Sequence, residues 1–241
     1  MSRHLYNSKL SKFVWFSNRF GAAEMIRKPL RLLFAPLIIP ALPKAALRFQ
    51  GAELELFYHR YNMTWACERC AEIPIGKFYL EQFRDRRILE VGNVLSHYFP
   101  RLHDVLDKFE KGNGIINQDI VDFTPSERYD LVLSISTFEH IGFDDEATVP
   151  SAQKIPAALT ACRKLLATDG KLVITVPIGY NPQLDRLIRE QELGTKKECY
   201  FERTAFSIWR ETSRSEALAR QYRQPFPYAN AILVAEFAAA E

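Results

Sequence analysis

The feature that most constrains the fold is a series of short β-prone runs that begins at residue 86. Turns or helical segments separate these runs along the chain. The series is RRILEVG (86–92), HDVLDKFE (103–110), GIINQDIVDF (114–123), YDLVLSIS (129–136) and GKLVITVP (170–177). Short apolar runs closed by glycine or polar residues are typical of buried parallel strands. Their alternation with crossover segments predicts an α/β fold with a parallel sheet.

The remaining elements of this region complete the predicted sheet. Residues 151–167 carry apolar side chains at helical spacing, with Pro156 in the first turn and Gly170 beyond the end. Both positions are favoured at helix boundaries. Two further runs, 198–206 and 229–237, have no long helix between them. We therefore expect them to form an antiparallel end to the sheet.

Composition changes along the 241 residues divide the chain into three parts. Residues 1–50 form a basic, apolar arm, and residues 51–85 form a connecting or lid segment rich in aromatic side chains. Residues 86–241 hold the predicted sheet. A chain of this length suits one large domain with an appendage.

The arm has two interpretations. Its most apolar stretch, residues 29–42, contains three prolines and is shorter than the roughly 20 residues that span a bilayer. The arm contains a single acidic residue, Glu24, among many basic ones. It is therefore either a peripheral anchor at the inner membrane surface or a helical arm that packs on the main domain or on a second subunit. The second interpretation includes a homodimer.

Charge and cysteine content narrow the partners and the compartment. The net charge of +3 gives no electrostatic case for nucleic-acid binding. Four cysteines are too few for a disulfide framework in a chain of this size. Cys67 and Cys70 form a single CxxC without a second pair, which indicates two cysteines of a helix or turn. We expect a reducing, cytoplasmic environment.

Polar residues and a glycine follow four of the predicted strands. Gly92 ends the first, Asp107 the second and Asp119 the third, while residues 134–140 (SISTFEH) end the fourth. Ligands of open α/β sheets bind at the carboxyl ends of the strands. One such residue could be a turn or cap residue, but four in order indicate a ligand site.

The motifs ILEVG, DVLDKFE, QDIVDF, YDLVLSISTFEHIG and DGKLVITVP together resemble those of class I S-adenosylmethionine-dependent methyltransferases. The resemblance covers about residues 86–180. It implies a Rossmann-like, seven-stranded, mostly parallel sheet with an antiparallel last strand, and S-adenosyl-L-methionine as cofactor. It further implies that Glu90 and Gly92 lie beside the methionine part of the cofactor and that Asp107 holds the ribose. Asp119 and Ile120 would hold the adenine, and Ser134, Ile135 and Ser136 would line the path to the sulfonium. Asn93 and Lys108 complete the predicted cofactor set.

The glycine-rich loop departs from the family pattern. The family usually has further glycines after the first, whereas this chain has Asn93, Val94, Leu95 and Ser96. The helix after the loop is also expected to be short. Either the loop is reshaped or the site is degenerate, and the presence of both carboxylates after the next strands favours reshaping.

A narrower resemblance concerns the acceptor. Residues 61–75 and 175–185 are similar to bacterial methyltransferases encoded with sugar-polymer and natural-product genes, whose acceptors are commonly sugar hydroxyls. Residues 61–75 would then form a lid, or else an amphipathic docking helix. The lid residues would be Tyr61, Thr64, Trp65, Arg69 and Glu72, and the acceptor would be held by Tyr180, Asn181, Asp185 and Arg69.

An alcohol acceptor must lose a proton, so a base is needed near the methyl group. His140 is the best candidate, because an imidazole titrates near neutrality, with Glu139 shaping the pocket. A structural histidine is the alternative. The acidic cluster 144–146 is better explained as a solvated loop than as a metal site, and no metal is predicted.

These features predict an S-adenosylmethionine-dependent methyltransferase that acts on a hydroxyl of a sugar or a related polar metabolite. One alternative is a small-molecule N-methyltransferase of the same fold. The other is a non-catalytic, methyltransferase-like partner subunit that has lost the cofactor. A dehydrogenase fits poorly, because the three spaced glycines of its fingerprint are missing.

Overall fold

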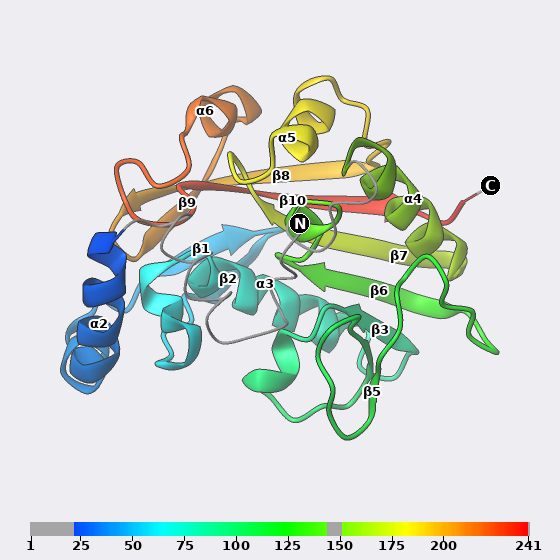
Figure 1. Cartoon of the computed structure of the whole chain (residues 1–241), viewed down its shortest axis with the longest axis horizontal. Helices are drawn as coiled ribbons and strands as arrows, with labels where there is room; N and C mark the ends of the chain where they lie inside the picture. Colours follow the sequence, from blue (N-terminus) through cyan, green and yellow to red (C-terminus); the bar gives the residue numbers. More distant parts are fainter. Residues whose placement is uncertain (1–21, 144–150, 241) are drawn as a thin grey trace.

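The structure is a computed structural model that describes residues 22–143 and 151–240 (Figure 1). Its centre is an eight-stranded sheet of order β5-β4-β3-β6-β7-β10-β8-β9. The strands of this sheet are β3 (Ile88–Val91), β4 (Asp104–Leu106), β5 (Ile115–Ile116), β6 (Tyr129–Ile135), β7 (Leu166–Pro177), β8 (Lys197–Ala205), β9 (Ile208–Thr212) and β10 (Ala231–Ala238).

The strand directions confirm the predicted Rossmann-like fold. Strands β3 to β7 are parallel to one another. The last strand of the chain, β10, lies between β7 and β8 and is antiparallel to both. The two C-terminal runs thus form the antiparallel end that the sequence predicted. The chain after β8 folds back as β9, which adds an eighth strand at the edge.

Two parallel strands are shorter than the runs that predicted them. Strand β4 ends at Leu106, because the Asp107 carboxylate accepts hydrogen bonds from the amides of Phe109 and Glu110 and turns the chain. Strand β5 contains only two residues. Strand β7 instead begins earlier than predicted, at Leu166, directly after helix α4 (Ser151–Lys164).

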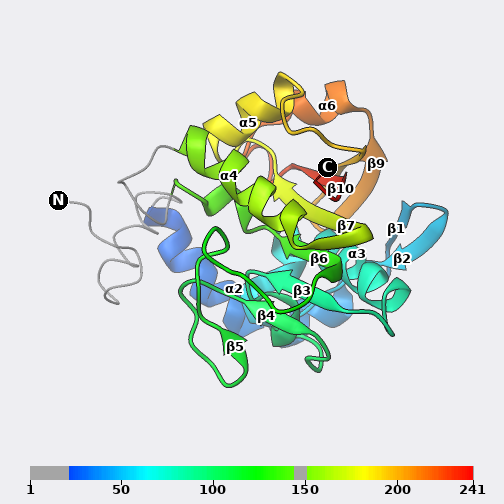
Figure 2. The same cartoon turned by 90° about the vertical axis from the view of Figure 1, so that its right-hand side faces the viewer.

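Two layers cover the sheet. Figure 2 shows α4, α5 (Pro182–Arg189) and α6 (Arg214–Ala219) on one side of it. On the other side lie α3 (Arg69–Gln82) and the hairpin of β1 (Ala46–Phe49) and β2 (Ala52–Glu55). Successive side chains of a strand point to opposite faces. Val132 of β6 accordingly joins the core under α4, and its neighbours Leu131 and Leu133 join the core under α3.

The N-terminal part described by the structure contains helix α2 (Ala22–Ala41) and the hairpin. The inner side of α2 packs on the 3-10 segment η1 (Tyr61–Ala66). The predicted boundary at residue 50 falls in the hairpin turn, and Leu47 and Phe49 before it are buried in the core. Among residues 22–143 and 151–240, no helix has the length and apolar character needed to cross a bilayer.

Candidate cofactor and active site

A cavity of about 530 Å³ opens at the carboxyl edge of the parallel strands. Loops after β3, β4, β5 and β6 contribute to its wall, together with η1 and α3. Its volume lies within the range of small-molecule and cofactor sites. Seven of the predicted cofactor residues line it: Gly92, Asn93, Asp107, Lys108, Asp119, Ile120 and Ser136.

Gly92 allows the loops after β3 and β6 to approach each other. Its φ angle is +86°, and a Cβ atom at this position would lie 2.2 Å from Oγ1 of Thr137. Its amide donates a hydrogen bond to the carbonyl of Leu106 at 2.8 Å. Both the backbone conformation and the lack of space therefore require glycine here.

The loop after Gly92 is reshaped around a buried carboxylate. Oε1 of Glu90 accepts hydrogen bonds from the amides of Val94 and Leu95 at 2.9 and 2.7 Å, and Oε2 lies 2.8 Å from Nε2 of His103. The chain continues as the short 3-10 segment η2 (Leu95–His97). Glu90 therefore shapes the loop from behind the cavity and, contrary to the sequence prediction, does not line it.

Asp107 joins two loops and still reaches the cavity. Its Oδ2 accepts a hydrogen bond from the amide of Asn93 at 3.0 Å, and its Oδ1 accepts those of Phe109 and Glu110 at 2.8 and 2.7 Å. A carboxylate has about four acceptor sites, so about one remains for a ligand hydroxyl. The residue that the sequence assigned to the ribose thus also holds the site together.

The wall formed after β5 combines a charged pair with apolar side chains. Nζ of Lys108 lies 2.8 Å from Oδ2 of Asp119, whose Oδ1 accepts a hydrogen bond from the amide of Val121 at 3.2 Å. Ile120 is buried beside them. The apolar lining here is Leu106, Ile120, Val121, Ile141 and Ala158. A flat heteroaromatic ring with an exocyclic amine matches this combination of apolar surface and carboxylate.

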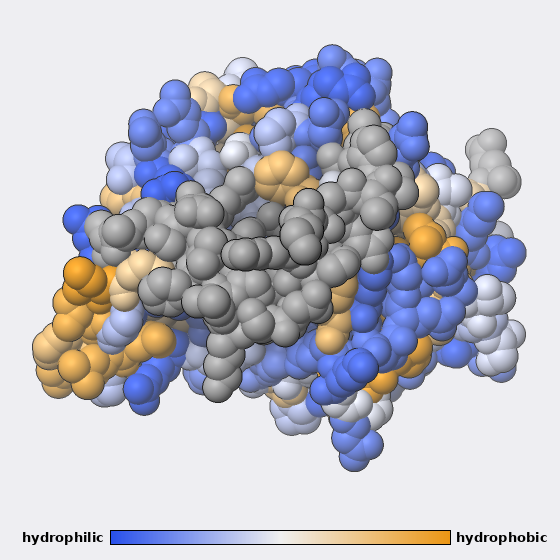
Figure 3. Space-filling model, in the orientation of Figure 1, coloured by the Kyte–Doolittle hydropathy of each residue, from blue (hydrophilic) through white to orange (hydrophobic). Residues whose placement is uncertain are grey.

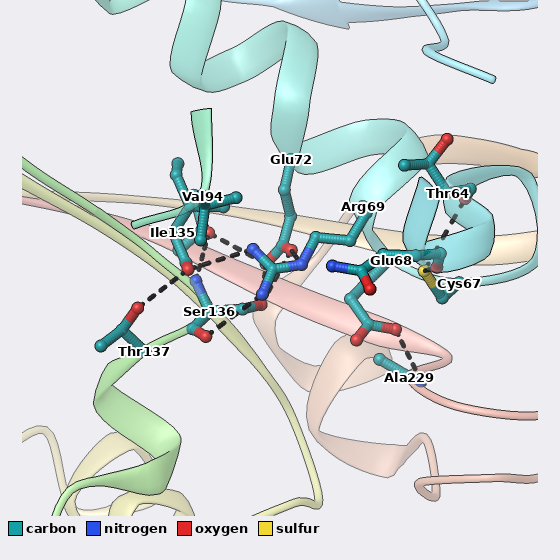
Figure 4. A network of polar contacts seen from close by, with 12 residues as sticks. Thr64, Cys67, Glu68, Arg69, Glu72, Val94, Ile135, Ser136, Thr137 and Ala229 are labelled. Carbon is teal, nitrogen blue, oxygen red and sulfur yellow. Dashed lines mark hydrogen bonds and ion pairs between the residues drawn. The ribbon is translucent and has the colours of Figure 1, made fainter. Parts of the chain in front are cut away.

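Helix α3 contributes an arginine and a buried carboxylate at the end of β6 (Figure 4). Arg69 lines the cavity, and its Nη1 and Nη2 donate to the carbonyls of Ile135 and Ser136 at 3.1 and 3.4 Å. Glu72 accepts hydrogen bonds from the hydroxyls of Ser136 and Thr175 at 2.7 and 2.9 Å. Burial raises the pKa of Glu72 to about 7, and the nearby Arg69 opposes this shift.

Two predicted residues of β6 do not line the cavity. Ser134 is fully buried, and its hydroxyl donates to the carbonyl of Val91 at 2.8 Å. Ile135 points into the core under α3. The strand alternates between two covered faces, so only its end, at Ser136, is open to the cavity. Ser136 has a φ angle of +40°, which marks the turn out of the strand.

The predicted base lies at the cavity, with its predicted partner behind it. His140, in the 3-10 segment η3 (Phe138–His140), lines the cavity, and its side chain is 37% exposed. Its Nδ1 lies 3.3 Å from the hydroxyl of Tyr180, and its Nε2 lies 3.6 Å from Oε1 of Glu139. Glu139 is buried, and its Oε2 has no hydrogen-bond partner among the described residues. Burial raises the pKa of Glu139 to about 7, and His140 opposes this shift.

Three predicted acceptor residues after β7 do not line the cavity. Tyr180 is buried, with its ring edge-on to that of His140 at 5.0 Å. Asn181 caps helix α5 by accepting the amides of Gln183 and Leu184, and it donates to the carbonyl of Glu139. Asp185 accepts the amide of Gly179 at 2.9 Å. Contrary to the prediction, these side chains are occupied by local structure, and only Arg69 of the predicted acceptor set reaches the cavity.

Of the predicted lid residues, some line the cavity and the others are buried behind it. Tyr61 and Arg69 line the cavity, whereas Thr64 and Trp65 are buried in the packing of η1 and Glu72 lies beneath the cavity wall. Thr64 donates its hydroxyl to the carbonyl of Phe57 at 2.7 Å. Helix α3, which contains residues 69–75 of the segment for which a docking helix is the alternative to a lid, packs on β6.

Several lining residues were not among the predicted site residues. The polar ones among them are His97, Glu110, Thr137, Gln118 and Lys154. His97 lies between Tyr61, whose ring centroid is 4.9 Å from its own, and Glu110, whose Oε2 is 3.3 Å from its Nε2. Glu110, Gln118 and Thr137 lie within the motifs DVLDKFE, QDIVDF and SISTFEH, which is the sequence signal that could have found them. The described residues contain no His, Cys, Asp and Glu group that could hold a metal ion, and the cluster 144–146 lies outside them.

No family model matches the chain, and no curated protein matches it. Solved structures that match it include the N-methyltransferase NodS from Bradyrhizobium japonicum WM9 in complex with S-adenosyl-L-homocysteine. It is 14% identical, with 69% of this chain and 86% of that chain covered and a TM-score of 0.41. A TehB-like SAM-dependent methyltransferase from Corynebacterium glutamicum is 18% identical, with 69% and 98% covered and a TM-score of 0.37.

The CcbJ methyltransferase from Streptomyces caelestis is 10% identical, with 69% of this chain and 88% of that chain covered and a TM-score of 0.38. All three TM-scores are below 0.5. The fold is therefore assigned from the sheet itself: its mostly parallel strands and its antiparallel last strand are those implied by the resemblance to class I S-adenosylmethionine-dependent methyltransferases.

Proposed function

We propose that this chain is an S-adenosylmethionine-dependent methyltransferase that holds its cofactor in the 530 Å³ cavity. One observation carries the proposal. Gly92, Asp107, Asp119 and Ser136 come from the ends of four different strands and line one cavity in the order of the motif series. The rule that ligands bind at the carboxyl ends of such sheets supports the same position.

The cavity residues fit the parts of the cofactor. Asp107 has acceptor capacity left for a ribose hydroxyl, and Ile120 with Asp119 offers an apolar wall beside a carboxylate for adenine. The close approach of Gly92 to Thr137 fixes the loop at the methionine end. When bound, the cofactor supplies a methyl group activated by its sulfonium. The residues of the chain then have to bind and orient both reactants.

The missing glycines do not favour the non-catalytic alternative. Val94 and Leu95 donate their amides to Glu90, so the loop has a defined conformation without further glycines. Val94 still lines the cavity. The loop is therefore reshaped around an open site, and it does not fill that site.

We propose a sugar hydroxyl, or the hydroxyl of a related polar metabolite, as the acceptor. If Nδ1 of His140 donates its proton to the Tyr180 hydroxyl, Nε2 is the unprotonated ring nitrogen and takes the proton of the alcohol. Glu139, whose Oε1 lies 3.6 Å from Nε2, then stabilises the imidazolium. Tyr61 and Arg69 contribute an aromatic ring and a cation from the lid segment to the same cavity.

An amine acceptor is the second candidate. The observation that favours it is Oε2 of Glu139, a buried carboxyl oxygen behind the site that has no hydrogen-bond partner among the described residues. When ionised, this carboxylate would stabilise the cationic N-methylated product. An amine would not need a base with a matched pKa.

Methyl transfer from labelled S-adenosylmethionine to matched panels of sugars and amines tests the proposal. An O-methylated sugar supports the sugar-hydroxyl proposal. An N-methylated product supports the amine candidate and overturns the sugar-hydroxyl proposal. The same panels with a heat-denatured sample provide the control. Binding of S-adenosylhomocysteine without transfer to either panel would leave the cofactor site intact and contradict both acceptor classes.

A further inference from the structure

Helix α2 carries a stripe of exposed apolar side chains. Its exposed members recur at helical spacing on one face, with exposed fractions of 68%, 47%, 65%, 48% and 73%: Ile26, Leu30, Leu33, Phe34 and Leu37. We call them the α2 stripe. Figure 3 shows apolar side chains gathered over this end of the molecule, where Figure 1 shows α2. A contiguous exposed apolar surface of this kind marks a contact with a partner or a membrane.

The opposite side of α2 is already used. Ala35 is buried, and Leu32, Ile38 and Ile39 pack against the cluster around Met63. The helix is therefore held on the domain by its inner side. The α2 stripe is left as an outward-facing ridge of a single helix.

The charges around the α2 stripe are basic. Arg27, adjacent to the stripe on the helix, has a side chain that is 64% exposed, although its Nη1 also lies 3.7 Å from Oε1 of Glu24, and Lys44 follows the helix in an exposed position. Glu24, the sole acidic residue of the first 50, is turned inward and pairs with Arg31 at 2.7 Å. The preceding sequence, residues 1–21, contains four basic residues and no acidic one.

We propose that the α2 stripe binds the surface of an anionic lipid bilayer, with α2 lying in the plane of the interface. An apolar face bordered by basic side chains is the pattern of interfacial helices, whose apolar residues enter the boundary between headgroups and acyl chains. The basic residues complement anionic headgroups. A ridge one helix wide also suits insertion into lipid better than a protein interface, which needs about 800 Å² from each partner.

Co-sedimentation of the full chain with vesicles tests this inference. We expect binding to vesicles that contain about one part phosphatidylglycerol to two parts phosphatidylcholine. The partition coefficient for vesicles of phosphatidylcholine alone should be lower, by about fivefold for each basic residue that lies at the membrane surface. Leu33→Glu with Leu37→Glu should lower the partition coefficient by about tenfold or more. Leu102→Glu is the matched control, because Leu102 is 88% exposed and lies far from α2 in the chain. Circular dichroism checks that each variant is folded.

The alternative occupant of the stripe is a second copy of the chain. Sedimentation velocity without lipid separates the two cases. A monomer that binds vesicles through the α2 stripe supports the inference. A dimer that the double variant dissociates, or vesicle binding that the double variant leaves unchanged, would overturn it. Each of these readouts is independent of cofactor binding and of methyl transfer.

Discussion

The hydroxyl of Ser136 donates a hydrogen bond to the carboxylate of Glu72 across 2.7 Å, although the two residues are 64 positions apart. This contact ties helix α3 to the end of β6, where the cavity begins. Thr175 of β7 donates to the same carboxylate. The lid segment and the carboxyl edge of the sheet are thus joined by one buried acid.

Stability should therefore depend on pH in an unusual direction. The pKa values of Glu72 and Glu139 are raised from 4.5 to about 7 in the folded chain. Between these values the folded state binds more protons than the unfolded state, so the contribution of both groups to the free energy of unfolding falls as pH rises. In a Glu72→Gln, Glu139→Gln double variant, this decrease in the free energy of unfolding with rising pH should be absent.

Urea denaturation at about pH 5, 6, 7 and 8 measures the effect, because this series runs from near the unfolded-state pKa of the two carboxyls to above their folded-state pKa. The double variant should gain stability relative to the parent as pH rises. Glu81→Gln is the control, because the side chain of Glu81 is 59% exposed on the same helix. Parallel pH profiles for the parent and the double variant would show that burial does not shift these carboxyls.

Gly92→Ala should destabilise the chain and weaken cofactor binding. The added methyl group would lie 2.2 Å from Oγ1 of Thr137, in a residue whose φ angle is +86°. Gly51→Ala is a closely matched control, because Gly51 has a φ angle of +83° but nothing within 4 Å of the added atom. Both variants carry the backbone strain, of about 1 kcal/mol. Only Gly92→Ala should lose more stability than this. Equal thermal stability of the two variants would argue against the close approach of the loops after β3 and β6.

Asp107→Asn should weaken binding of S-adenosylhomocysteine by about 1–3 kcal/mol, because a ligand hydroxyl loses its carboxylate acceptor. It should also lower stability, since the same carboxylate accepts three main-chain amides. Asp122→Asn removes an exposed carboxylate from the same region and serves as the control. Titration calorimetry and thermal melts measure both effects. A loss of stability with unchanged affinity would make Asp107 a purely structural residue.

His140→Ala should lower turnover about 10²–10⁴-fold if this residue is the base for an alcohol acceptor. Cofactor affinity should stay nearly unchanged, because the effect is on a proton transfer. Tyr180→Phe removes the hydroxyl near Nδ1 and should give a smaller loss that appears in kcat rather than KM. A loss of tenfold or less for His140→Ala would leave it a structural histidine.

The strands of the sheet could be predicted from sequence because their signal is local. Apolar runs such as 129–136 and 170–177 need no partner to be recognised. The order of the elements then fixed the carboxyl edge, and Asp107 and Asp119 both proved to line the cavity. The positions of these two residues can be predicted from the ends of the strands that precede them.

Side-chain direction could not be read in the same way. Strand β6 is covered on both faces, so its sequence does not show which residue of 134–136 is open to the cavity. Tyr61 reaches the cavity through a turn in which Asn62 and Met63 have φ angles of +52° and +48°, a conformation set by tertiary packing. Asn181 did have a local signal, because an Asn before Pro182 is typical of a helix N-cap.

Isothermal titration of the folded full-length chain with S-adenosylhomocysteine tests the central claim most directly. The cavity at the carboxyl edge of the sheet has Gly92, Asp107 and Asp119 in its wall. We therefore predict saturable binding with about one site per chain, weakened in Asp107→Asn and unchanged in Asp122→Asn. Absence of binding by a chain that is folded by circular dichroism would contradict the assignment of this cavity to the cofactor.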